Sequence, residues 1–325
     1  MKAKRLLIVA FTYLMVSGCA QTDGVKTIRL GHGLDVGHSV HKAMVKMGED
    51  LYQLSNGKLN LEIYPSQQLG TERQCLELLQ IGSLDMTKVS VGVLENFAPR
   101  MKVLGLPFLF RDREHSFKVL DGPIGQQLLN EGEQYWLKGL GYYDAGSRSF
   151  YTKDKPVHSP EDLLGQKIRV MESVTAMEMV RSLGGSPTPI SWGELYTALQ
   201  QGVVDGAENN PPSFYLSRHY EVAKYYTLDE HTVLPDVLLA GTHLWEGLNE
   251  QEQQWLMEAV KNSVVYQRKL WMEAENEALE AVEKAGVQII RPDKTLFSDK
   301  LKDSFEQYKE DESFYQLIKE IQATH

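Results

Sequence analysis

The chain contains 325 residues, of which 24% are charged, and its formal net charge at pH 7 is −10. This acidic balance argues against a nucleic-acid-binding protein, whose electrostatic footprint is a basic surface. A chain of this length can bury a large hydrophobic core, and with only two cysteines, Cys19 and Cys75, we expect no disulfide framework. An anionic ligand would need a local positive pocket on such a protein, which makes individual arginines informative.

The first 20 residues have the pattern of an export signal. Residues 1–5 carry three positive charges, and residues 6–16 are apolar with one exception, which is too short a stretch to span a membrane. The following residues resemble a bacterial lipobox, which would make residues 1–18 a signal peptide and Cys19 a lipidated first residue. The competing interpretation cleaves after Ala20 and releases a soluble protein. Either one places the mature chain, with its charge changed from −10 to −13, outside the cytoplasmic membrane.

The mature chain opens with a β-α-β pattern. Residues 27–31 predict a strand, residues 40–55 an amphipathic helix, and residues 59–64 a second strand. The first loop contains His32 and His38, and ligands of parallel α/β domains bind in the loops beyond the carboxyl ends of the strands. Ligand binding by these histidines competes with solvation or helix capping, the more common uses of a loop histidine.

Two further candidates follow this opening. Glu72 comes after Thr71, a predicted N-cap of a helix over residues 72–81, and it could favour the helix start or bind a ligand hydroxyl. Ser90 lies in a short predicted strand and could also bind a hydroxyl. Cys75 is interpreted as a small packing residue.

The middle of the chain alternates between strand and helix periodicity, which predicts an α/β fold. Helices are expected over residues 113–120 and 123–138, then a strand over residues 139–145 and another, residues 146–151, that crosses between two lobes. A late strand, residues 235–242, would complete the first sheet, which leaves a ligand cleft between the lobes. The predicted lobes are residues 27–145 with about 231–270, and residues 146–230 with about 271–325.

A helical pattern of about 36 residues runs from Asn249 to Gly286 without an internal glycine or proline. The apolar spacing drifts too much for a coiled coil. Trp255, Tyr266 and Trp271 are better suited to packing along two lobes.

One arginine lies inside a predicted buried strand. Arg169 stands between Ile168 and Val170, and a helical pattern begins just beyond, at Ser173. A shielded guanidinium can bind a carboxylate through paired N–H donors, at roughly 1.5–3 kcal/mol per hydrogen bond. The alternative is an ion pair with a neighbouring Asp or Glu, because buried arginines are usually paired within the protein.

Two later loops carry further candidates. Trp192 ends an extended segment and is either a core residue or a platform for a ring face. Asn209 and Asn210 precede a double proline, and such a fixed loop is suited to presenting an amide.

Several motifs occur in a specific order along the mature chain: Tyr64–Ser66 with Gln68–Gly70, Gly82–Asp85, Gly165–Val170, Pro187–Pro189 and Gln201–Asn209. In this order they resemble the periplasmic solute-binding proteins of tripartite ATP-independent (TRAP) transporters. The resemblance implies a two-lobed, periplasmic-binding-protein-like α/β fold with a long helix crossing both lobes. It implies closure of the lobes over a small organic acid.

The resemblance also implies roles for individual residues. The family's carboxylate-binding arginine corresponds to Arg169, a second arginine to Arg148, and the amide beside the same carboxylate to Asn209. No further cation is evident for a second acid group, so we expect a sugar acid, in particular a hexuronate, with a C4-dicarboxylate or 2-oxo acid as the alternative. The remaining candidates would bind hydroxyls or cover a ring face: Glu72, Asn210, Ser90, His32, His38 and Trp192.

The expected partners are the small and large membrane subunits of a TRAP transporter, for a receptor that is itself a monomer. A sensor that passes its closed state to a receptor is an alternative. An enzyme is the least favoured class, because the sequence has no nucleophile elbow, metal-spaced His/Cys cluster or phosphate loop. We expect no cofactor, no metal and no nucleic acid.

Overall fold

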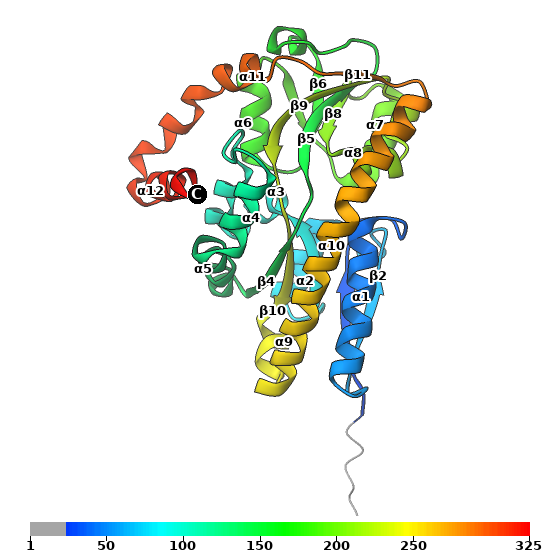
Figure 1. Cartoon of the computed structure of the whole chain (residues 1–325), viewed down its shortest axis with the longest axis vertical. Helices are drawn as coiled ribbons and strands as arrows, with labels where there is room; N and C mark the ends of the chain where they lie inside the picture. Colours follow the sequence, from blue (N-terminus) through cyan, green and yellow to red (C-terminus); the bar gives the residue numbers. More distant parts are fainter. Residues whose placement is uncertain (1–23) are drawn as a thin grey trace, which may run out of the picture.

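The structure, a computed structural model, describes residues 24–325, so the predicted signal peptide and Cys19 lie outside the described residues. Two mixed β-sheets occupy the two halves of an elongated molecule, with helices on their faces (Figure 1). This confirms the predicted two-lobed α/β fold. Within the described part of the chain, no helix combines the length and the apolar character that a membrane span requires.

The first sheet contains the predicted β-α-β opening and a late strand. Its strand order is β2 (Leu59–Tyr64), β1 (Lys26–Gly31), β3 (Met86–Ser90), β10 (Asp236–Gly241) and β4 (Leu137–Tyr143). Strand β10 runs antiparallel to both of its neighbours and all its residues are buried. The prediction that a late strand completes the first sheet is thereby confirmed.

The second sheet combines segments from the middle and the end of the chain. Its strand order is β11 (Gln288–Ile290), β9 (Tyr225–Val233), β5 (Ser147–Thr152), β8 (Gly206–Asn209), β6 (Lys167–Val170) and β7 (Ser186–Pro189). Strand β9 pairs antiparallel with β5 and was not predicted from the sequence. Charged and hydroxyl residues interrupt its apolar pattern, and several of them are buried in polar contacts.

Helices cover both sheets. The α-helices before the long helix are α1 (Ser39–Leu54), α2 (Glu72–Gln80), α3 (Val91–Leu94), α4 (Arg113–Asp121), α5 (Pro123–Glu131), α6 (Val174–Ser182), α7 (Leu195–Gln201), α8 (Pro211–Leu216) and α9 (Thr242–Gly247). The 3₁₀ helices of this region are η1 (Pro99–Gly105), η2 (Gly132–Tyr135), η3 (Pro160–Leu163), η4 (Trp192–Glu194) and η5 (His219–Glu221). The predicted helix over residues 123–138 was too long, because η2 and the left-handed Trp136 (φ 60°) end it before β4.

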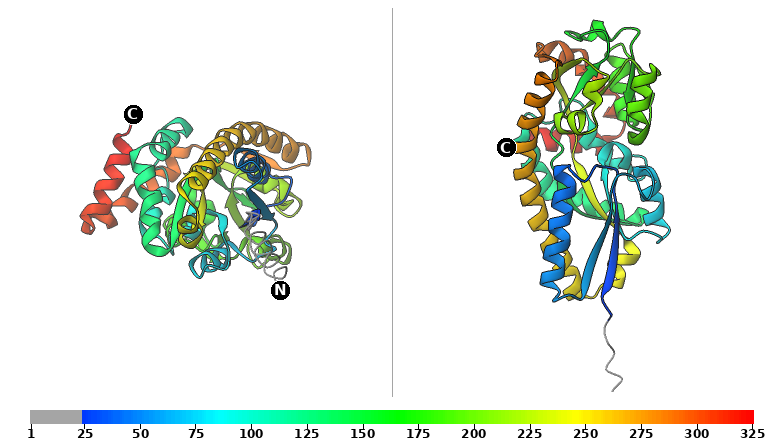
Figure 2. Two further views of the ribbon diagram at one scale, coloured as in Figure 1. Left: turned by 90° about the horizontal axis from the view of Figure 1, so that it is seen from below. Right: turned by 90° about the vertical axis from the view of Figure 1, so that its right-hand side faces the viewer.

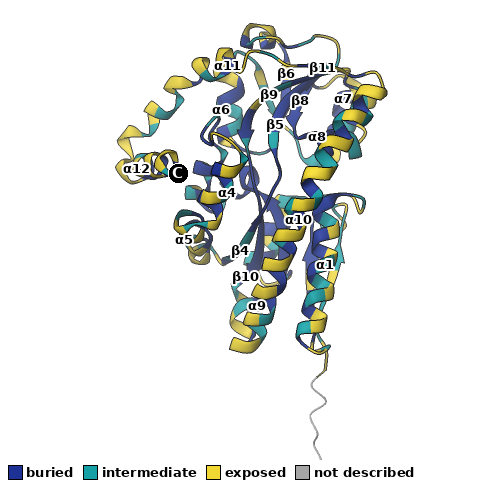
Figure 3. Ribbon diagram, in the orientation of Figure 1, coloured by how far each residue is buried: buried dark blue, intermediate teal, exposed yellow. Residues whose placement is uncertain are grey.

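The long helix α10 (Glu250–Lys284) runs beside both halves (Figures 1 and 2). A capping box between Asn249 and Glu252 begins it, at the residue where the predicted helical pattern starts. Its buried face contacts the core of the first half through Leu256 and the core of the second through Val282, while its outer face is exposed (Figure 3). The helix is therefore a common support for both lobes.

The C-terminal region is divided into three helical segments. It consists of α11 (Lys294–Lys300), η6 (Lys302–Glu310) and α12 (Glu312–Ala323). The apolar face of α12, including Phe314 and Ile318, packs into the core of the first half. We therefore propose counting α12 with the first lobe rather than with residues 271–325 of the second; the other lobe boundaries stay a prediction.

A short crossing joins β4 to β5 between the two halves. The backbone N–H of Asp144 donates to Gln267 Oε1 (2.9 Å), and its carbonyl accepts from Gln267 Nε2 (2.7 Å). Gly146 has φ +59°, and a Cβ there would lie 2.8 Å from Trp271 Nε1 and 2.7 Å from Glu275 Oε1. Side chains of α10 thus fix the crossing, and only glycine fits at its tightest point.

Replacing Gln267 with leucine should destabilise the protein. The side chain is fully buried, and its loss leaves both backbone groups of Asp144 unsatisfied, so the free energy of unfolding should fall by about 2–5 kcal/mol. Urea denaturation measures the change. The control is Gln254→Leu, an exposed position of the same helix, which should change the value by less than about 0.5 kcal/mol. Equal effects of both variants would contradict this role of Gln267.

Candidate functional site

A cleft between the two halves contains about 790 Å³ of empty space, part of it open to solvent. Both sheets and α10 contribute to its walls. Eight of the nine predicted ligand-binding residues line it: His38, Glu72, Ser90, Arg148, Arg169, Trp192, Asn209 and Asn210. The cleft therefore gathers candidates that lie far apart in the sequence.

Arg169 on β6 is buried (1% exposed) and has no ion-pair partner within residues 24–325. Its Nε donates to the carbonyl of Ile190 (2.8 Å), whereas Nη1 is buried without any hydrogen-bond partner. Burial lowers the pKa of this guanidinium below its ordinary value and outweighs the opposing effects of Tyr151 and Glu208. The alternative of an internal pair for Arg169 is thus wrong, and its charge faces the cleft uncompensated.

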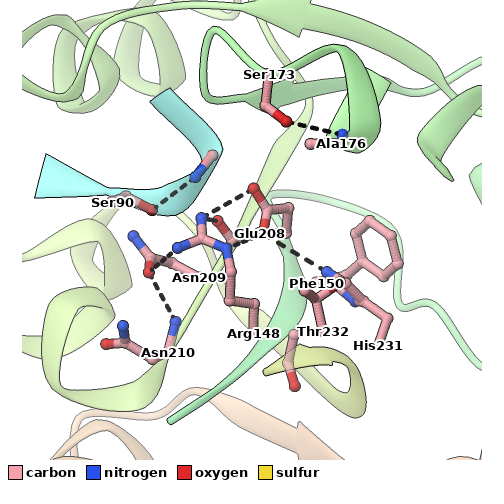
Figure 4. Close-up of polar contacts among 12 residues, drawn as sticks. Ser90, Arg148, Phe150, Ser173, Ala176, Glu208, Asn209, Asn210, His231 and Thr232 are labelled. Carbon is pink, nitrogen blue, oxygen red and sulfur yellow. Dashed lines mark hydrogen bonds and ion pairs between the residues drawn. The ribbon is translucent and has the colours of Figure 1, made fainter. Parts of the chain in front are cut away.

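Arg148 on β5 has a different environment (Figure 4). It forms a bidentate ion pair with Glu208, in which Nε donates to Oε2 and Nη2 donates to Oε1 (2.9 Å). Nη2 also donates to the carbonyl of Glu208 (2.7 Å), and Nη1 donates to Asn209 Oδ1 (2.9 Å). Four of the five guanidinium N–H groups are therefore used within the protein. Arg148 positions Asn209 and keeps one donor free.

The Arg148–Glu208 pair continues into a buried network on β9. Nδ1 of His231 lies 2.7 Å from Asp229 Oδ2, and its Nε2 lies 3.5 Å from Glu208 Oε2. Burial alone would lower the pKa of His231, but Asp229 and Glu208 raise it to about 9. Burial alone would raise the pKa of Glu208, but Arg148 and then His231 hold it at about 2. Two cations and two anions thus alternate and compensate each other behind the cleft wall.

The two asparagines of the loop after β8 have their amide oxygens occupied. Asn209 Oδ1 accepts from Arg148 and from the backbone N–H of Asn210 (2.9 Å). Asn210 Oδ1 caps α8 by accepting from the backbone N–H of Ser213 (2.9 Å). Their Nδ2 groups donate to no acceptor within the described residues. Both amides therefore present N–H donors to the cleft.

The opposite wall contains a lysine that the sequence analysis missed. Lys88 Nζ lies 2.9 Å from Glu72 Oε1 and 3.1 Å from Asp236 Oδ2, and Glu72 Oε2 accepts from the backbone N–H of Ser90 (3.1 Å). Burial alone would lower the pKa of Lys88, but Asp236 and Glu72 raise it. Two carboxylates around one ammonium leave this wall net negative. A lysine within the otherwise uncharged strand Met86–Ser90 was the available sequence signal.

Trp192 stands at the start of η4, half-buried, with its ring centroid 5.9 Å from Arg169 Cζ and 5.2 Å from the ring centroid of His219. Indole and guanidinium attract each other at such distances. The indole ring therefore lies beside Arg169, where it could cover one face of a ligand bound to this arginine.

Of the two candidate histidines of the first loop, only one lines the cleft. His38 lines the cleft and also caps α1, because its Nδ1 accepts from the backbone N–H of Val40 (3.2 Å). His32 does not line the cleft: its Nδ1 accepts from Leu34 N–H (3.1 Å), and its Nε2 lies 3.0 Å from His41 Nδ1. Both ring nitrogens of His32 are bonded within the protein, so we leave His32 out of the proposed site.

Cys75 is a free, buried thiol in the core of the first half, which confirms its packing role. Among residues 24–325, no group of three or more His, Cys, Asp or Glu side chains is arranged to hold a metal ion.

Two α/β lobes around a cleft with one uncompensated arginine define a binding protein for an acidic solute. Residues 30–311 match the family of bacterial extracellular solute-binding proteins, family 7, and the chain belongs to this family. The family is extracytoplasmic and consists of solute receptors. The predicted membership among TRAP solute-binding proteins is thereby confirmed.

Solved structures of TRAP periplasmic solute-binding proteins share the fold and contain bound sugar acids. One from a Bradyrhizobium species with galacturonate is 43% identical, covers 92% of this chain and 100% of its own, and has a TM-score of 0.90. One from Xanthobacter autotrophicus with β-D-galacturonate is 39% identical with the same coverage and a TM-score of 0.89. One from Pseudomonas putida with D-glucuronate is 36% identical, covers 91% and 97%, and has a TM-score of 0.88.

The raised pKa of His231 predicts that stability falls in mild alkali. Between its ordinary value of 6.5 and about 9, the folded protein keeps a proton that the unfolded chain releases. The contribution of His231 is therefore complete below pH 6.5 and is lost as the pH rises through about 9. Across this window the wild type should lose on the order of 3 kcal/mol that His231→Gln does not lose.

Urea denaturation at several pH values from about 6 to about 10 provides the measurement. His158→Gln, at an exposed position, is the control and should retain the wild-type pH dependence. If His231→Gln retained it as well, the charged network behind the cleft would be assigned incorrectly.

Proposed function

We propose that this protein is the extracytoplasmic receptor of a TRAP transporter and that it binds a hexuronate in the cleft. The observation that carries the proposal is the buried Arg169, which faces the cleft without a counter-ion. A buried charge requires an opposite charge, and a ligand carboxylate provides it with matching bidentate geometry. The free amide donors of Asn209 and Asn210 support the same assignment.

The distribution of charge in the cleft favours a ligand with a single acid group. Arg148 is neutralised by Glu208, and Lys88 lies between Glu72 and Asp236. The wall formed by these carboxylates would repel a second carboxylate and accept hydrogen bonds from hydroxyl groups. A sugar acid, which carries one carboxylate and several hydroxyls, therefore fits better than a C4-dicarboxylate.

The similar structures support this choice of ligand. Those from Bradyrhizobium, Xanthobacter autotrophicus and Pseudomonas putida contain galacturonate or glucuronate. We infer that this chain takes the same class of ligand in its own cleft. Trp192 would then cover the sugar ring beside the arginine.

We further propose that the receptor acts as a monomer and delivers its ligand to membrane subunits. Ligand contacts to both lobes would favour the closed state. Direct contacts also join the halves: Glu95 beside α3 accepts from Thr175 of α6, at 3.1 Å from the backbone N–H and 2.7 Å from Oγ1. Such contacts would stabilise closure once the ligand is in place.

Isothermal titration of residues 21–325 tests the proposal with D-galacturonate, D-glucuronate and the corresponding neutral sugars. The wild type should bind a uronate and not the neutral sugars. Arg169→Ala should weaken uronate binding by about 10²- to 10³-fold, since losing one partner of a buried charge pair costs about 2–5 kcal/mol. Arg181→Ala, at an exposed arginine of the following helix, should retain the affinity.

Two outcomes would contradict the proposal. Wild-type affinity in Arg169→Ala would exclude this arginine as the anchor of the carboxylate. Binding of malate or a 2-oxo acid, with no binding of either uronate, would overturn the choice of ligand but not the receptor function.

A further inference from the structure

Two aromatic side chains of the cleft have buried nitrogens without hydrogen-bond partners. His38, at the start of α1, is 3% exposed, and Trp271, on α10, is 1% exposed. Their ring centroids lie 5.7 Å apart and both rings line the cleft. Neither His38 Nε2 nor Trp271 Nε1 has a partner among residues 24–325. The pair belongs to the cleft but is separate from the arginine.

Both nitrogens are neutral hydrogen-bond donors. His38 Nδ1 accepts a backbone N–H from Val40, so a neutral ring carries its hydrogen on Nε2. Burial, with the charge of Lys88 as the next cause, lowers the pKa of His38 to about 3, which keeps the ring neutral at physiological pH. The indole of Trp271 can only donate. The two rings therefore offer two N–H donors to a ligand, and neither ring has a free acceptor of its own.

Two buried N–H donors destabilise the protein unless they find a hydrogen-bond acceptor. A buried donor without a partner costs about 1–3 kcal/mol, and native proteins keep few of them. Arg169 Nη1, which we assign to the ligand, is a third such atom in the same cleft. The shared location indicates that the ligand supplies the missing partners of all three.

We propose that the N–H groups of His38 and Trp271 bind the ring oxygen of the sugar acid and so select its cyclic form. This inference rests on the proposed function. Two donors are best satisfied by an oxygen that has lone pairs and no hydrogen of its own. In the cyclic form of a hexuronate only the carboxylate and the ring oxygen meet this condition, and Arg169 takes the carboxylate.

The position of the pair agrees with this assignment. In a hexuronate the ring oxygen is attached to the carbon that bears the carboxylate, so its donors must lie beside the carboxylate site. Trp271 Nε1 would be 2.8 Å from a Cβ at Gly146, only two residues before Arg148. The indole N–H of the pair therefore borders the crossing that leads into β5, the strand whose Arg148 positions Asn209.

The inference is tested by a thermodynamic cycle in which a side chain of the protein and the ring oxygen of the ligand are replaced separately and together. D-galacturonate and D-glucuronate are compared with their carbocyclic analogues, in which a methylene group replaces the ring oxygen, by isothermal titration. The wild type should prefer the natural ligand about tenfold, the effect of one good hydrogen bond. In Trp271→Phe and in His38→Ser, where serine can still cap α1, this preference should fall to about threefold or less.

Trp255→Phe is the matched control, because it removes an indole N–H from the same helix outside the cleft, and it should retain the tenfold preference. Thermal unfolding midpoints show whether Trp271→Phe and His38→Ser are folded. If one of them does not fold, the ligand preference of the other tests the inference. An undiminished preference in the folded variants would overturn the inference. Absence of uronate binding by the wild type would instead overturn the proposed choice of ligand, on which this inference rests.

Discussion

Burying a positive charge without a negative partner is unfavourable, and the cleft is organised around one arginine in this state. Arg169 has no carboxylate within the described structure, whereas Arg148, on a strand of the same sheet, is held by Glu208. The difference separates the roles of the two residues. Arg148 belongs to a network of compensating charges that fixes the cleft wall. The positive charge of Arg169 is neutralised only when an anion binds in the cleft.

The walls around this charge are held by contacts within each half of the molecule. Asn209 and Asn210 have their oxygens fixed by Arg148 and by the start of α8, so their N–H groups need no rearrangement before binding. The ion pairs of Lys88 fix the opposite wall. Such preorganisation reduces the loss of side-chain conformational entropy on ligand binding. The motion between open and closed states then falls on the few segments that cross between the halves.

Local sequence patterns predicted much of this structure, because they depend on interactions between near neighbours. The β-α-β opening, the long helix from Asn249 and the strand that carries Arg169 are of this kind. Local patterns could not predict side-chain pairing between distant segments. Arg148 and Glu208 are 60 residues apart, and no nearby residue distinguishes an arginine that forms an ion pair from one that does not. For the same reason the sequence did not show that His38 faces the cleft while His32 does not.

Strand β10 has a consequence for how the protein is made. It lies between β3 and β4 in the first sheet, although some 90 residues of the second lobe separate it from β4 in the chain. The first sheet therefore cannot be completed until most of the polypeptide has been synthesised. Pairings between such distant segments form slowly. Until then the amino-terminal part of the chain lacks the strand that joins β3 to β4, so it cannot form the complete core of the first lobe on its own.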